Sequence, residues 1–219
     1  MGIDVNEILE QFRNGIESCC QSDERKDFRW FLQRTFLEDA ELAPGDSPVH
    51  VLLIGMNPSK ATKLVKGAEG DGTTGLICDW VDEINSGVHE HAGFAPNERI
   101  AKVTILNLIP LVNGVSLDVG AQWNKLPEVH EAVHKTTRIL MRECLETTDI
   151  VIPMWGAYDG HSWKFEPADF ISKALQETSN RIRILGVANA DGSPRHIRAK
   201  WRGKPLKEHV LRTVGILTT

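Results

Sequence analysis

The stretch Val49-His50-Val51-Leu52-Leu53-Ile54-Gly55-Met56-Asn57-Pro58-Ser59 is an apolar, β-branched run that ends in a loop with polar side chains. Such a run is typical of a buried parallel strand. Gly55 permits unusual backbone angles or the close approach of a ligand, and Pro58 stiffens the turn. We therefore expect Asn57 as a fixed amide at the carboxyl edge of the sheet, where open α/β folds bind their ligands.

Three further apolar runs predict strands, and helical patterns alternate with them. The expected strands are 49–54, 102–107, 149–154 and 182–187, and the expected helices are 5–17, 74–86, 127–147, 164–178 and 205–214. Residues 26–38 fit a second helix or a mixture of helix and strand. Strands separated by gaps this long are joined by crossovers, which favours a parallel sheet covered on both faces.

These patterns predict one α/β domain over residues 1–219, long enough to bury a sizeable core. Its expected architecture is a three-layer α/β/α sandwich around a short, mostly parallel central sheet of about four strands. We expect residues 1–45 to form an N-terminal helical region and residues 192–219 a basic C-terminal segment.

The composition is that of an ordinary globular protein, with 41% hydrophobic and 25% charged residues. No apolar run approaches the ~20 residues that span a bilayer, and the N-terminus lacks the features of a secretion signal. The four cysteines include no C-x-x-C pair, which argues against a zinc ribbon or an iron–sulfur cluster and for free thiols in a reducing compartment. We expect a cytoplasmic monomer that contacts no membrane and uses no cofactor.

The net charge of −5 hides a strong asymmetry along the chain. Residues 192–219 contain seven Lys or Arg and one acid, so this segment carries +6 and the remaining residues carry −11. A basic face that includes Trp201 suits phosphate contacts together with packing against a base or a sugar. A solvated tail is the alternative, but the segment directly follows a candidate site loop.

Each predicted strand ends in a loop with a notable polar or aromatic side chain. In a parallel sheet these ends lie on one edge, so Asn57, Asn107, Trp155 and His196 are expected to converge on one pocket. Residues 60–73, rich in Gly, Lys and Thr, predict one long loop, and loops of that length are often functional lids.

In their order, four motifs resemble those of the uracil-DNA glycosylase superfamily. They are Gly55-Met56-Asn57-Pro58, Leu106-Asn107, Met154-Trp155-Gly156-Ala157-Tyr158 and Ser193-Pro194-Arg195-His196. The first loop is most similar to that of the mismatch-specific branch. Most of residues 29–200 also resembles an uncharacterised bacterial and phage domain family with an Arg-aromatic start and Asn-Pro-Ser, Trp-Gly and Pro-Arg-His motifs. The superfamily resemblance implies hydrolysis of an N-glycosidic bond in DNA that leaves an abasic site.

The resemblance also implies roles for single residues. Asn57 would hold the attacking water, Asn107 would read the base edge, and His196 or nearby backbone N–H groups would stabilise the departing base. Tyr158 or Trp155 would stack on the base, although Trp155 fits a buried core position equally well. The implied base-binding residues are Gly55, Met56, Ser59, Asn107, Trp155 and Tyr158, and the implied DNA-binding residues are Ser193, Arg195, Arg198, Lys200 and Arg202.

The chain departs from the uracil-specific branch at two positions of the first loop. Asn57 replaces a more active Asp, so water activation needs a carboxylate base, for which Asp71 is the candidate; its alternative is an Asp in a turn. Ser59 replaces a Tyr that excludes larger bases. We therefore predict a damaged or modified base, an enlarged pyrimidine, as the substrate in DNA repair or in defence against phage with modified DNA.

A rival motif, His130-Glu131-Ala132-Val133-His134, has zinc-ligand spacing on a helix. Its extension lacks a third histidine, because Leu140 occupies that place, so an exposed polar helix face is the favoured interpretation. Two further alternatives are a nucleic-acid or nucleotide binder without the chemistry, and a glycosidase that acts on free nucleotides.

Overall fold

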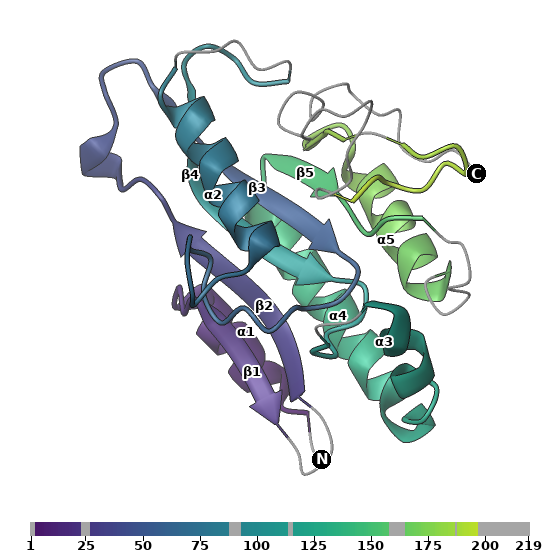
Figure 1. The fold of residues 1–219 in the computed structure, drawn as a ribbon. Coiled ribbons are helices and arrows are strands. Elements are labelled where there is room, and N and C mark those ends of the chain that lie inside the picture. Colours follow the sequence, from purple (N-terminus) through teal and green to yellow (C-terminus); the bar gives the residue numbers. More distant parts are fainter. Residues whose placement is uncertain are drawn as a thin grey trace.

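The computed structural model describes residues 3–22, 27–87, 93–113, 116–157, 165–186 and 188–196. Across these residues six strands form one sheet in the order β1-β2-β4-β3-β5-β6 (Figure 1). The strands are β1 (Ser18–Ser22), β2 (Asp27–Thr35), β3 (Ser47–Gly55), β4 (Glu98–Asn107), β5 (Ile150–Pro153) and β6 (Arg183–Ile184). The helices are α1 (Val5–Arg13), the short 3-10 helix η1 (Asp39–Glu41), α2 (Gly72–Asn85), α3 (Ser116–Trp123), α4 (Pro127–Thr147) and α5 (Phe165–Thr178).

The four strands predicted from the apolar runs form a continuous parallel block, which confirms the α/β class. β3 pairs in parallel with β4 on one side and with β5 on the other, and β5 pairs in parallel with β6. The chain thus moves from β3 to one neighbour and then crosses to the other. The carboxyl ends of β3 and β5 therefore form the topological switch point at which open α/β sheets bind ligands.

The prediction of a sheet of about four strands and of a helical region over residues 1–45 was wrong. β1 and β2 add two antiparallel strands beside β4, and α1 and η1 are the helices of that region. In β2 consecutive residues from Phe28 to Gln33 are buried, because the strand lies inside the sheet and both of its faces are covered. Burial on both faces removes the alternating pattern by which a strand is recognised.

Helices cover both faces of the sheet, in three layers (Figure 1). Leu52 and Ile54 of β3 point to one face and pack in a core with α1, α4 and α5. Val51 and Leu53 point to the opposite face and pack against Ile77, Trp80 and Val81 of α2. The alternation within β3 thus places one strand between two apolar layers, and this holds its carboxyl end in a fixed position.

Smaller differences from the predicted elements concern β6, α3 and the C-terminal segment. The predicted strand 182–187 is reduced to the two residues of β6, and α3 was not predicted. The predicted helix 205–214 lies outside the described residues.

All four cysteines are free thiols. Among the described helices, none has both the length and the apolar character required to traverse a bilayer.

Candidate functional site

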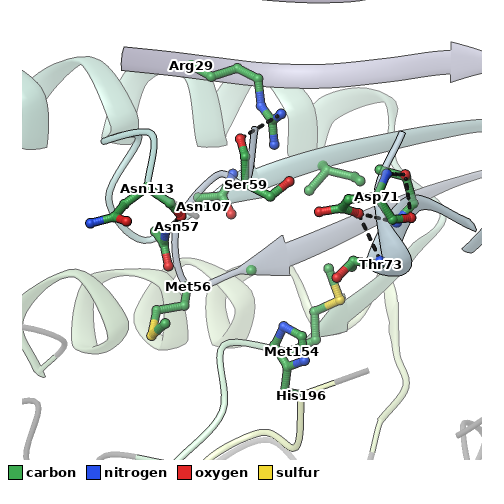
Figure 2. A pocket seen from close by; sticks show the side chains of 13 residues that line it. Arg29, Met56, Asn57, Ser59, Asp71, Thr73, Asn107, Asn113, Met154 and His196 are labelled. Atoms are coloured by element: carbon green, nitrogen blue, oxygen red, sulfur yellow. Dashed lines mark hydrogen bonds between the residues drawn. The ribbon is translucent and has the colours of Figure 1, made fainter. Parts of the chain in front are cut away.

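A pocket of about 210 Å³ lies at the switch point, where β3 and β5 end beside the start of α2 (Figure 2). An enclosed cavity of roughly 150 Å³ already holds a benzene ring, so this pocket has room for a planar ring with substituents. The predicted site residues that line it come from four separate stretches of the chain. They are Gly55, Met56, Asn57, Ser59, Asp71, Asn107 and His196.

Asn57 is held in a single orientation. Its Nδ2 donates hydrogen bonds to the carbonyl oxygens of Pro58 at 3.1 Å and Asn113 at 2.9 Å. Both amide protons are used in this way, so a flipped amide would place Oδ1 against two carbonyl oxygens. Oδ1 accepts no hydrogen bond from the described residues, which leaves a fixed acceptor on the pocket wall.

Asp71 is the N-cap of α2 and lines the pocket at the same time. Its Oδ1 accepts hydrogen bonds from the backbone N–H groups of Thr73 and Thr74, both at 2.8 Å. Partial burial raises the pKa of Asp71, but the Ser59 hydroxyl and the helix N–H groups outweigh burial and bring the pKa below its ordinary value. The carboxylate is therefore ionised at neutral pH. Asp71 caps the helix and also lines the pocket, so the two alternatives offered by the sequence are not exclusive.

Asn107 is the last residue of β4 and lies opposite Gly55 in the sheet register. It is only 6% exposed, and its Nδ2 is buried without a hydrogen-bond partner. A Cβ atom at position 55 would lie 2.7 Å from Asn107 Oδ1, so the glycine is what permits this side chain to lie against the strand end. A buried donor without a partner costs about 1–3 kcal/mol, which a ligand acceptor would offset.

Arg29 also lines the pocket and was missed as a site residue. It enters from β2 and is 4% exposed. Its Nη1 donates to the backbone carbonyl oxygen of Ser59 at 3.4 Å (Figure 2). Nη1 also donates to the Ala61 carbonyl oxygen, while Nε is buried without a partner. The available signal was a single arginine inside the apolar run from Phe28 to Leu32. Other lining residues that the sequence did not indicate are Thr73, Thr74, Ile105, Asn113 and Met154.

Two of the implied site residues are buried and do not line the pocket. Trp155 is 1% exposed and belongs to the core beneath the sheet, so it does not stack on a base in the pocket. Ser193 is fully buried, where its hydroxyl donates to Asp191 Oδ1 at 2.6 Å and accepts from Asn189 Nδ2 at 3.0 Å. These hydrogen bonds hold the last loop, and the burial of Ser193 does not support its predicted contact with DNA. Both residues were assigned by motif position, and motif position does not report which way a side chain points.

The remaining implied residues have a less defined place. Arg195 is partly buried and does not line the pocket. Tyr158, Arg198, Lys200 and Arg202 lie outside the described residues, so their roles stay predictions.

The histidines of the rival motif pack against Trp123. The His130 ring stacks on Trp123 with centroids 4.0 Å apart, and its Nε2 lies 2.9 Å from the Trp123 carbonyl oxygen, to which it must donate. His134 Nδ1 lies 3.7 Å from Glu166, and burial lowers the pKa of His134. Within the described ranges no three His, Cys, Asp or Glu side chains are grouped as a metal site. The favoured exposed helix face was only partly right, because both rings are half-buried.

We predict that this histidine pair holds no zinc, because His130 Nε2 is committed to a carbonyl group. The purified protein should contain far less than one zinc per chain and should keep its melting temperature in the presence of a chelator. Elemental analysis and thermal unfolding measure both. One zinc per chain that is lost in a His134→Ala variant would contradict this prediction and favour the metal site.

We compared the chain with protein families, curated proteins and solved structures. No curated protein and no solved structure matched it. A family described as "Protein of unknown function (DUF1643)" matches residues 29–196. This range begins at the buried arginine of β2, ends at the histidine of the pocket and contains all the residues that line it. Because the match spans most of its length, the chain belongs to the DUF1643 family.

Proposed function

We propose that this protein is a monofunctional DNA glycosylase of the uracil-DNA glycosylase type. The observation that carries the proposal is the locked Asn57 amide, whose acceptor Oδ1 lies on the wall of a ring-sized pocket. A water held by such an acceptor has its lone pairs directed away from the amide, toward a reacting carbon. The unpaired Nδ2 of Asn107 supplies a donor for the edge of a base in the same pocket.

The proposed reaction is a hydrolysis. Water adds its oxygen to C1′ of the deoxyribose, the bond from C1′ to the base nitrogen breaks, and both electrons of that bond leave with the base. The ionised Asp71 takes up one water proton while Asn57 Oδ1 holds the water by accepting a hydrogen bond, and the other proton stays on the new C1′ hydroxyl. The products are a free base and an abasic site. Among the described residues that line the pocket none is a lysine that would form a Schiff base, so no strand cleavage is expected.

The substrate class follows from the wall of the pocket and the charge of the chain. Ser59, a small side chain, lies on the wall beside Asp71, which leaves room for a substituent on the base. An enlarged pyrimidine is therefore the proposed substrate, in repair or in defence against phage with modified DNA. The +6 charge of residues 192–219 supports DNA over a free nucleotide, because each phosphate contact adds affinity that falls with salt.

The experiment that tests this proposal is an excision assay with labelled oligonucleotides, single- and double-stranded, that carry uracil, thymine or 5-substituted cytosines. Excision should give an intact strand that breaks only after alkali treatment, which cleaves at abasic sites. The same bases offered as free nucleotides test the nucleotide-level alternative. If no base is released from any of the oligonucleotides, the glycosylase proposal is wrong. If the strand is cut before alkali treatment, the monofunctional mechanism is wrong.

A further inference from the structure

Arg29 is a buried cation, and the part of the chain that the structure describes supplies no acid that neutralises it. The guanidinium is 4% exposed and forms no ion pair with the residues that the structure describes. Its hydrogen bonds to the described residues all use Nη1 and go to neutral backbone carbonyl groups, so Nε is buried without a partner and Nη2 donates to none of these residues. A buried charge is costly unless it is paired and fully hydrogen-bonded. The arrangement therefore points to a missing acceptor, and the pocket is where an acceptor would enter.

The other titratable groups on the pocket wall leave this positive charge in place. They are Asp71 and His196. Asp71 is engaged by two N–H groups of α2 and by the Ser59 hydroxyl, and it forms no ion pair with Arg29. Its attraction raises the pKa of Arg29 by less than burial lowers it. The carboxylate of Asp71 thus has its hydrogen-bond donors within the protein, whereas the guanidinium of Arg29 lacks an acidic partner among the described residues.

We propose that Arg29 binds the excised base as its anion. This inference rests on the proposed function, in which the bond electrons leave with the base and place negative charge on its ring nitrogen and carbonyl oxygens. A guanidinium with unused donors forms short, charge-assisted hydrogen bonds to such a group. In a water-poor site, a fixed cation stabilises developing charge without reorganisation. The ligand class is a pyrimidine with carbonyl groups and an acidic ring N–H.

A purely structural role for Arg29 has a matched control on the same strand. Arg29 tethers the loop after β3 through the carbonyl groups of Ser59 and Ala61, and Arg34 tethers it through the Leu64 carbonyl group at 3.0 Å. Arg34 does not line the pocket. Removing Arg34 therefore loosens the loop and leaves the pocket charge unchanged, whereas removing Arg29 loosens the loop and also removes the positive charge from the pocket.

The test measures the binding of two free bases to the full chain by calorimetry at about pH 7.5. One is 5-nitrouracil, whose ring N–H is acidic enough to leave it an anion, and the other is thymine, which stays neutral. The anion should bind at least about tenfold more tightly, the size expected for hydrogen bonds to a charged group. Arg29→Gln should erase this preference, and Arg34→Gln should keep it.

Each outcome decides the inference separately from the glycosylase proposal. A preference that depends on Arg29 supports the inference even if no oligonucleotide is cleaved. Equal binding of the two bases, no binding of either, or a preference that survives in Arg29→Gln overturns it even if excision is observed. Should Arg29→Gln not fold, Arg29→Lys carries the test. A lysine has no fork of donors, so the preference should fall at least threefold or so, and an unchanged preference would overturn the inference.

Discussion

Replacement of Asn57 by alanine is expected to abolish base release, with excision slowed by roughly 10²–10³-fold or more. The physical reason is that the amide acts on the attacking water and makes no contact that binding requires. DNA affinity should therefore change by less than about twofold, since a water-positioning group contributes mainly in the transition state. Single-turnover excision and DNA binding at low salt, measured on the same protein, separate the two quantities.

The geometry of the amide gives this prediction a sharper form. Asn57 Nδ2 donates to two carbonyl oxygens, so a carboxylate at this position would place an anionic oxygen against both of them. Asn57→Asp should therefore fail to restore activity, although Asp is the residue of the uracil-specific branch. Asn97→Ala serves as the matched control. Asn97 is exposed and does not line the pocket, and its Nδ2 likewise donates to a backbone carbonyl group, that of Gly45. Full excision by Asn57→Ala would refute the mechanism.

The parallel half of the fold could be predicted because its strands are continuous apolar runs. The stretch from Val49 to Ile54 occupies the centre of the sheet, and helices cover both of its faces. That position makes the run apolar without interruption and places Gly55 and Asn57 at the edge where ligands bind. Strand direction predicted that Asn57, Asn107, Trp155 and His196 would converge, and all of these except Trp155 line the pocket.

The antiparallel half could not be predicted by the same reasoning. β2 carries Arg29, Trp30 and Gln33 among its buried residues, so neither a helical nor an alternating pattern stands out. Gln33 donates to the carbonyl groups of Phe12 and Ile16, and Arg29 to those of the pocket loop. These polar side chains are buried because distant segments supply acceptors, and sequence patterns carry no information on such long-range partners. The charge of the pocket was missed for that reason.

His50 is expected to make the protein lose stability as the pH falls from about 6.5 toward 4. This side chain is 8% exposed, its Nδ1 donates to the Thr147 carbonyl at 3.0 Å, and its Nε2 accepts from the Thr104 hydroxyl at 2.8 Å. Burial and the positive charge of Lys102 lower its pKa from 6.5 to about 4, despite opposing effects of Thr147 and Asp149. Between these two pH values His50 is protonated in the unfolded chain and stays neutral in the folded chain.

The sign and size of the effect follow from proton linkage. Because the unfolded state binds more protons in this range, the free energy of unfolding decreases as the pH is lowered. His50 alone accounts for a decrease of about 2 kcal/mol between about pH 7 and 4.5. His50→Asn keeps an amide donor for the Thr147 carbonyl group but cannot be protonated. It should be less stable than the wild type near neutral pH, because the Thr104 hydroxyl loses its acceptor. Its further loss on acidification should nevertheless be smaller by about the same 2 kcal/mol.

Urea unfolding at the two pH values measures this difference, and carboxylates that titrate in both proteins cancel when the two pH-dependent losses are subtracted. An equal loss in wild type and variant would show that His50 is protonated in the folded protein. The loss of stability at low pH also affects the pocket, because His50 lies in β3, the strand that ends at Gly55 and positions Asn57. Acid sensitivity of base release below about pH 5 should therefore follow unfolding in the wild type, and it should weaken in the variant.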